Sequence, residues 1–210
     1  MRKSILSLMI GLALCGAVDA QLLGLPIADS ATRLGAGSLR AGAHLTLGDE
    51  ANLYGVRAAF GATESLDLFA DLGLVAPDDW DNAPALQGGA LYALPLDGPL
   101  DVAARCTIGF ARLESNDFGQ KVTSDLFAIH GGALASMDYS PVTPYAYLGL
   151  CYWNASYSGD GLDSSGADDI EPALAAGALF SLDNLPALSF FGEVAYIDGV
   201  FFSAGANLAF

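Results

Sequence analysis

Positive charge is scarce in this sequence. Its 210 residues include 8 Lys and Arg against 24 Asp and Glu, which gives a formal net charge of −16. Nucleic-acid binders need clustered basic side chains to neutralise phosphates, so this composition excludes that class of protein. Charged residues of both signs make up only 15% of the chain and apolar residues make up 53%, which excludes intrinsic disorder.

Cysteines and long apolar runs are also few. Three cysteines are too few for a disulfide scaffold. After the first twenty residues, no uncharged apolar run reaches the roughly 18–20 residues that a membrane-spanning helix needs. Yet the mean hydropathy is +0.42, which is high for a soluble enzyme. The fold must therefore explain a hydrophobic chain of one-domain length that has no spanning helix.

Residues 1–20 have the pattern of a secretory signal peptide. Two basic residues precede an apolar stretch over residues 5–17, and small residues precede a cleavage position before Gln21. A single anchoring helix is the alternative, but the apolar stretch is short for one. A lipoprotein signal would need a small residue before Cys15, where a leucine stands. The chain after cleavage keeps 6 basic and 23 acidic residues.

The rest of the sequence alternates between apolar and small or polar residues, with turn residues at regular intervals. This pattern predicts antiparallel strands of about ten residues each. The predicted strands are Ser38–Leu47, Leu53–Ala62, Leu66–Val75, Leu86–Leu94, Leu100–Leu113, Asp125–Met137, Tyr145–Tyr157, Pro172–Leu182, Leu188–Ile197 and Val200–Phe210.

Each predicted strand has one apolar face and one face of small, polar or charged residues. A soluble ligand-binding barrel would place the apolar face inside, whereas a membrane barrel places it outside. The polar face carries few charges of mixed sign, and Lys121 is the only lysine after residue 20. A solvated exterior would carry more charge, so the polar face is predicted to line a narrow interior.

The connections between the predicted strands fall into two alternating sets. One set is rich in Asp, Asn, Gly and Ser, and the other consists mostly of tight turns. Alternate connections of an up-and-down barrel emerge at the same end, so one end carries the longer acidic loops. An even strand count places both chain ends at the tight-turn end. Asp198-Gly199 supplies a hairpin turn before the last strand.

With this signal peptide, these strands and a last strand that ends in Phe210, the chain resembles the small outer-membrane β-barrel proteins of Gram-negative bacteria, such as those of the OmpA, OmpX and OmpW kind. The resemblance implies a single closed antiparallel transmembrane barrel of about ten strands, with eight as the alternative. It implies that Phe202, Leu208 and Phe210 form the signal that the barrel assembly machinery reads. It also implies contact with outer-membrane lipid and lipopolysaccharide, export through the Sec pathway, and a monomer.

The resemblance also sets the expected domain layout. Residues 1–20 are the signal peptide, 21–37 a periplasmic lead-in or the start of strand one, and 38–210 the outer-membrane barrel. Tyrosines near strand ends are expected to form an interfacial girdle, with ordinary β-propensity as the alternative; they are Tyr92, Tyr145, Tyr152 and Tyr196.

Charged side chains on the polar face are the first candidate site. They are expected to pair across a slim lumen, either as a polar plug that satisfies buried charges or as an ion-selecting constriction. The excess of Asp would favour cations if a pore exists. The set comprises Arg40, His44, Arg57, Asp67, Asp71, Asp101, Arg105, His130 and Glu193.

The acidic loop predicted over Ser158–Asp169 is the second candidate site. Its aspartates could hold Ca²⁺ or Mg²⁺ weakly, and such ions could also bridge lipopolysaccharide phosphates. The spacing does not match an EF-hand, and a solvated loop is the alternative. The candidate ligands are Asp160, Asp163, Asp168 and Asp169.

No catalytic arrangement stands out in the sequence, and no cofactor is expected beyond loosely bound Ca²⁺ or Mg²⁺. The two histidines fall mid-strand, away from a nucleophile or carboxylate at defensible spacing. Cys106 and Cys151 fall on strands that are not neighbours, so two unpaired buried thiols are expected. The function predicted is a structural or interaction role, or a narrow passive channel. A soluble periplasmic barrel for a hydrophobic ligand and a lipid-modifying enzyme are the alternatives.

Overall fold

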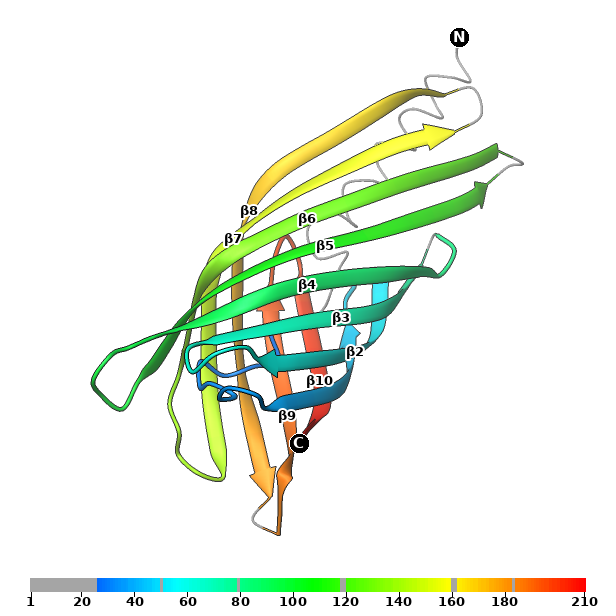
Figure 1. The fold of residues 1–210 in the computed structure, drawn as a ribbon. Coiled ribbons are helices and arrows are strands. Elements are labelled where there is room, and N and C mark those ends of the chain that lie inside the picture. The colour runs from blue at the N-terminus through cyan, green and yellow to red at the C-terminus, as the bar shows by residue number, and fades with distance from the viewer. Residues whose placement is uncertain (1–25, 50, 79, 118–119, 160–161, 183) are drawn as a thin grey trace.

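Ten strands form one closed antiparallel barrel in the computed structural model (Figure 1), which describes residues 26–49, 51–78, 80–117, 120–159, 162–182 and 184–210. The predicted fold class and strand number are therefore confirmed. Within the described residues, no helix is long and apolar enough to cross a membrane. The strands are β1 (Leu39–Leu47), β2 (Ala51–Gly61), β3 (Leu66–Pro77), β4 (Ala83–Leu94), β5 (Asp101–Asp117), β6 (Gln120–Ser136), β7 (Val142–Gly159), β8 (Leu162–Leu182), β9 (Leu185–Tyr196) and β10 (Val200–Ala209).

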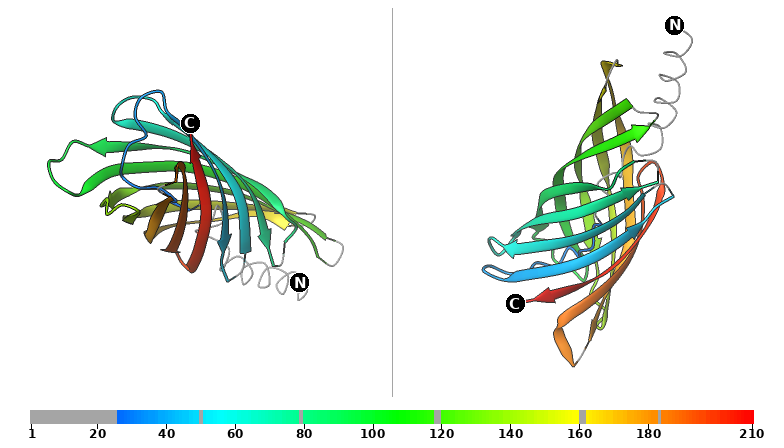
Figure 2. Two further views of the ribbon diagram at one scale, coloured as in Figure 1. Left: turned by 90° about the horizontal axis from the view of Figure 1, so that it is seen from below. Right: turned by 90° about the vertical axis from the view of Figure 1, so that its right-hand side faces the viewer.

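The barrel closes where the first and last strands meet. Each strand pairs with its neighbours in the chain, and β1 pairs antiparallel with β10 from Arg40↔Ala209 to Leu47↔Phe202. The backbone N–H of Phe210 donates to the carbonyl of Leu39 at 2.8 Å. The strands form a continuous, tilted wall around the lumen (Figure 2). Closure gives the barrel wall no unpaired edge, which a spanning sheet requires because lipid offers no hydrogen bonds.

The outer surface of the barrel is apolar and the inner face is polar. Charged and amide side chains such as Arg57, Asp71 and Gln87 are buried inside. Soluble proteins rarely expose contiguous apolar surface on this scale, and the arrangement is the reverse of a soluble barrel with an apolar pocket. The exposed apolar side chains include Leu68, Leu72, Leu74, Leu86, Ile108, Phe110, Leu148, Leu150, Phe190, Val194 and Phe202.

Strands β5 to β8 continue well beyond the rest of the barrel at one end (Figure 1). The predicted loop over Ser158–Asp169 and the predicted strand ends at Leu113 and Asp125 are wrong in extent, because β5 continues to Asp117, β6 begins at Gln120, β7 continues to Gly159 and β8 begins at Leu162. Neighbouring hairpins satisfy each other's backbone groups: β6 still pairs with β7 at Val122↔Gly159, and β7 with β8 at Tyr157↔Ser165. We call this four-stranded part the β5–β8 extension.

Aromatic rings on the inner face lie over glycines of the neighbouring strand. Directly opposed pairs include Phe69 with Gly89, Tyr145 with Gly177 and Phe191 with Gly205. A Cβ built on Gly177 would lie only 2.5 Å from the Tyr145 ring, and the other two pairs show the same distance. The missing side chain thus lets each ring lie flat against the wall, which keeps bulky residues inside a narrow lumen.

Substitutions at two adjacent glycines of β6 would test this packing of aromatic rings against glycines. A Cβ on Gly132 would lie 2.4 Å from the carbonyl oxygen of Leu148 and 2.7 Å from the Tyr147 ring, whereas a Cβ on Gly131 meets nothing within 4 Å. We expect Gly132→Ala to lower the free energy of unfolding by about 1–3 kcal/mol through overpacking. Urea unfolding of the refolded protein would measure this.

Gly131→Ala is the matched control, because it gains the same reduction of unfolded-state entropy without a clash. It should leave the unfolding midpoint unchanged or slightly raised. Equal destabilisation of the two variants would contradict the packing of Tyr147 against this wall.

The apolar outer surface predicts that a charge there is costly only in lipid. Leu148 lies outward in mid-β7 and is 64% exposed, and Leu96 is 58% exposed in the turn between β4 and β5. Leu148→Arg should lower the stability of the barrel in lipid vesicles by about 2–4 kcal/mol. Leu96→Arg, beyond the strands, should have little effect.

Unfolding in vesicles, followed by the gel shift between boiled and unboiled samples, would measure both variants. A Leu148→Arg protein that is as stable as the parent, and soluble without detergent, would contradict a lipid-facing surface.

Candidate functional site in the barrel lumen

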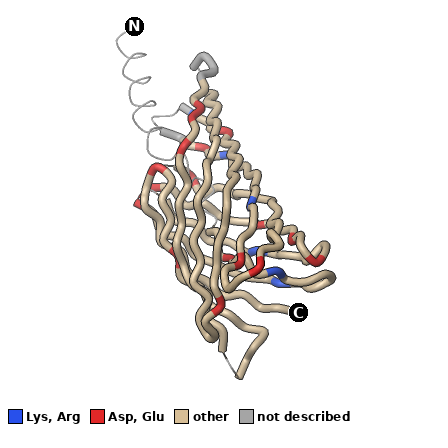
Figure 3. Tube along the Cα trace, turned by 90° about the vertical axis from the view of Figure 1, so that its left-hand side faces the viewer, with Lys and Arg blue, Asp and Glu red and all other residues tan. Residues whose placement is uncertain are grey.

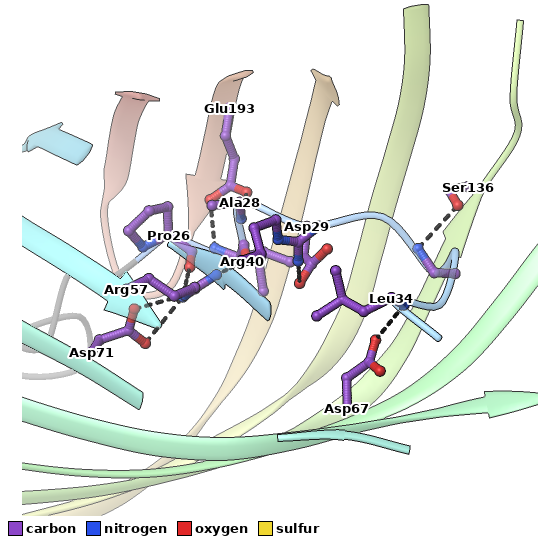
Figure 4. A network of polar contacts seen from close by, with 12 residues as sticks. Pro26, Ala28, Asp29, Leu34, Arg40, Arg57, Asp67, Asp71, Ser136 and Glu193 are labelled. Carbon is purple, nitrogen blue, oxygen red and sulfur yellow. Dashed lines mark hydrogen bonds and ion pairs between the residues drawn. The ribbon is translucent and has the colours of Figure 1, made fainter. Parts of the chain in front are cut away.

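Residues 26–34, here called the lumenal segment, run through the interior of the barrel. Its hydrogen-bond partners come from β1, β2, β3, β5, β6 and β9. A segment reaches so many strands of one closed barrel only from inside (Figure 4). Residues 26–31 are buried there. The lumenal segment therefore occupies the centre of the polar interior.

Glu193 of β9 holds the first part of the lumenal segment. Its carboxylate accepts hydrogen bonds from the backbone N–H of Ile27 at 3.0 Å and of Ala28 at 2.9 Å. The Tyr145 hydroxyl donates to the same carboxylate at 2.8 Å. Ala28 has a φ of 49°, in the left-handed region. The carboxylate thus binds two successive N–H groups, which a buried anion needs in place of water.

Arg57 of β2 holds the same part of the segment from the carbonyl side. Its guanidinium donates to the carbonyl oxygens of Ile27 at 2.5 Å and Pro26 at 2.7 Å. It also forms an ion pair with Asp71 of β3 at 2.6 Å, and Gln87 donates to that carboxylate at 3.1 Å. Both charges are buried and multiply hydrogen-bonded (Figure 4), as a buried ion pair requires.

The second part of the lumenal segment leads toward the turn end of the barrel. Asp29 forms an ion pair with Arg40 at 2.5 Å. The N–H of Ala31 donates to the Ser136 hydroxyl at 3.0 Å, and the N–H of Leu34 donates to Asp67 at 3.0 Å. Thr32 donates to Asp101 at 3.0 Å, close to the rim.

The predicted lumen residues lie in two groups. Arg40, Arg57, Asp67, Asp71, Asp101 and Glu193 contact one another or the lumenal segment. The others, His44, Arg105 and His130, lie on the inner face without a described ion pair, and Cys151 Sγ lies 3.5 Å from His130 Nε2. Asp101 is exposed at the start of β5.

The sequence analysis missed five side chains of this network: Gln87, Tyr145, Ser136, Asp29 and Thr32. Gln87, Tyr145 and Ser136 belong to the inward-facing positions of their strands, so the period-two pattern could have revealed them. Asp29 precedes the first strand and carries no such pattern. The girdle prediction is wrong for Tyr145, which points into the lumen, whereas Tyr92 and Tyr196 are exposed outside.

Residues 21–37, which include the lumenal segment, were expected to be a periplasmic lead-in or the start of strand one. Among the described residues the lumenal segment forms no strand, and β1 begins at Leu39. Its backbone N–H groups bind lumen side chains instead of a neighbouring strand. Residues 1–20, with the predicted signal peptide, and residues 21–25 lie outside the described residues.

The predicted metal ligands are only partly described. Asp160 lies outside the described residues, as does the side chain of Asp163, while Asp168 and Asp169 are exposed on β8. Within the part of the chain that is described, no group of three or more His, Cys, Asp or Glu side chains could hold a metal ion. Binding at this rim stays a prediction.

The remaining predicted positions lie on the outer surface or near it. Phe202, Leu208 and Phe210 are exposed on the outside of the last strand and at its end. Cys106 also faces outward and is exposed, contrary to the expected burial, and it forms no disulfide with the inward-facing Cys151.

No protein-family model and no curated protein matches this sequence. Among solved structures, the translocator domain of autotransporter NalP from Neisseria meningitidis matches at a TM-score of 0.54 and 11% identity, covering 84% of this chain and 88% of that one. Ail, the attachment invasion locus protein of Yersinia pestis, matches at a TM-score of 0.44 and 16% identity, covering 82% and 95%. The chain has the fold of bacterial outer-membrane β-barrels.

The buried Arg57–Asp71 pair gives a test of the lumen network. Asp71→Asn should lower the free energy of unfolding by about 3–5 kcal/mol, because it leaves the Arg57 charge without its counterion. Replacing both residues, as in the double variant R57M/D71L, should recover part of this loss. Urea unfolding in detergent micelles would measure all three proteins.

The exposed pair Arg112 and Asp125 is the control, since surface ion pairs contribute about 0–1 kcal/mol. Asp125→Asn should therefore be nearly neutral. An Asp71→Asn variant that behaves like Asp125→Asn would contradict the burial of the lumen pair.

Proposed function

We propose that this protein is an outer-membrane barrel closed by its own lumenal segment, with a structural or interaction role rather than that of an open channel. The proposal rests on the hydrogen bonds that two buried side chains form with the backbone of residues 26–28. Glu193 accepts from two N–H groups of the segment, and Arg57 donates to two of its carbonyl oxygens. A segment held by β2 and β9, and further along by Ser136 of β6, would obstruct the passage of water through a barrel of this size.

The placement in the outer membrane rests on the apolar outer surface and on the closed strand wall. Residues 1–20 would direct export through the Sec pathway. The last strand, with Phe202, Leu208 and Phe210 outward, would be read by the barrel assembly machinery. The folded monomer would contact outer-membrane lipid and lipopolysaccharide, and the proposal assigns it no catalysis.

The start of β1 and the end of β10 lie together at the end of the barrel that has the tight turns. The β5–β8 extension lies at the opposite end and would therefore project from the external face. Acidic residues lie along the extension (Figure 3), among them the exposed Asp168 and Asp169. Such a rim would attract Mg²⁺ or Ca²⁺ ions that also bridge lipopolysaccharide phosphates. The extension would thus be the part that interacts with partners outside the membrane.

Conductance across a planar bilayer tests the closure. The parent protein should show no steady current. Ala28→Pro should open the lumen intermittently, because proline lacks the N–H that donates to Glu193 and cannot adopt the φ of 49°. Ala28→Gly is the matched control: it keeps the N–H, accepts this φ and should stay closed.

A steady, cation-selective current through the parent protein would contradict the proposal and favour the narrow passive channel. Closed Ala28→Pro barrels would show that these contacts of residue 28 do not keep the lumen shut. Heat-modifiable mobility on a gel would establish that each variant is folded.

A further inference from the structure

Arg105 of β5 is a second buried guanidinium of the lumen, and within the described ranges it forms no ion pair with a carboxylate. It is 5% exposed, and its Nη2 has no hydrogen-bond partner among the described residues. Its Cζ lies 4.7 Å from the centroid of the Phe69 ring. Arg57, by contrast, has Asp71 and two carbonyl oxygens. A buried cation with a free donor costs solvation energy unless something else accepts from it.

Other unpartnered donors lie on the same wall. The hydroxyls of Thr107 and Tyr147 are buried and have no hydrogen-bond partner among the described residues. Arg105 opposes Gly132 on β6, and Gly132 opposes Gly149 on β7. The Tyr147 ring lies over these two glycines, with its hydroxyl 2.4 Å from a Cβ built on Gly149. Because neither glycine has a side chain, the ring can lie against the wall there. Its hydroxyl therefore lies at the level of Arg105, which opposes Gly132 across the sheet.

Each lumen carboxylate has another partner, although the buried Oδ1 atoms of Asp29 and Asp67 accept no hydrogen bond from a described residue. Asp71 accepts from Arg57 and Gln87, and Glu193 accepts from Tyr145 and two backbone N–H groups. Among the described residues, the wall of β5 to β7 thus presents a guanidinium nitrogen and two hydroxyls that no carboxylate hydrogen-bonds. This is the chemistry that recognises an oxyanion, because a guanidinium and nearby O–H groups bind several oxygens of one group.

We propose that Arg105, with Tyr147 and Thr107, forms a binding site in the lumen for a small oxyanion, a carboxylate or phosphate group. Arg105 supplies the charge and the forked donors, and the two hydroxyls complete the coordination. The site uses contacts separate from those that hold the lumenal segment at Glu193 and Arg57. It therefore does not depend on whether the barrel conducts, and a binding experiment can fail without affecting the proposed closure.

Tryptophan fluorescence offers a direct readout. Trp153 lies on the same inward face of β7, and Trp80 is the only other tryptophan. Substituting Trp80 by Phe leaves Trp153 as the single reporter. The refolded protein in a zwitterionic detergent would be titrated with sodium phosphate and, separately, sodium acetate, at ionic strength held constant with sodium chloride. The two series distinguish a phosphate from a carboxylate ligand.

We expect a saturable change of fluorescence with at least one of the two anions. Arg105→Gln should weaken binding by about tenfold or more, the range expected for a lost charge-assisted hydrogen bond. Tyr147→Phe keeps the ring over the glycines and should weaken binding less. Arg112→Gln is the matched control, since Arg112 is an exposed arginine of the same strand, and should bind as the parent does.

No saturable response to either anion in the parent protein would overturn the proposal, and so would unchanged binding in Arg105→Gln. If Arg105→Gln does not give a heat-modifiable folded band, Arg105→Lys and Tyr147→Phe decide. Lysine keeps the charge but lacks the forked donors of a guanidinium, and phenylalanine lacks the hydroxyl of Tyr147. Both variants should therefore bind more weakly than the parent. Parent-like binding in both would equally overturn the site.

Discussion

The need to satisfy every backbone hydrogen bond within the wall shapes the whole molecule. Ten strands meet this need by closing into a barrel, in which Phe210 donates to Leu39 beside the last strand pair. Closure also means that one face of each strand points outward and the other points into the lumen. The leucines and phenylalanines cover the outside, and the polar residues are enclosed in a narrow interior where few waters can solvate them.

Enclosing charges creates the second problem that the structure solves. Buried Arg57, Asp71 and Glu193 need partners, and the strands alone do not supply enough of them. The lumenal segment does so with its own backbone, because its N–H groups bind Glu193 and its carbonyl oxygens bind Arg57. The contacts that hold the segment inside the barrel are thus the same contacts that satisfy the buried charges of Glu193 and Arg57. Arg105 stands outside these contacts, and its Nη2 has no hydrogen-bond partner among the described residues.

Strand existence could be predicted because it depends on a local pattern. The outward Leu68, Leu72 and Leu74 of β3 alternate with inward Asp67, Phe69 and Asp71, and any strand with this pattern has two distinct faces. The length of β7 and β8 could not be predicted this way. Residues 158–169 are rich in Ser, Gly and Asp and alternate weakly. The described residues among them, 158–159 and 162–169, belong to β7 and β8 because neighbouring strands pair with them.

The sequence by itself determined the fold class, the two faces of each strand and most of the residues that line the lumen, because alternation is a property of adjacent residues. Only the tertiary structure decided what those residues contact. The bond between Ile27 and Glu193 joins positions 166 residues apart, and the pattern of neither neighbourhood encodes it. Curvature and register bring such positions together. For that reason the lumenal segment, Asp29 and the unpartnered donors around Arg105 emerged only from the folded barrel.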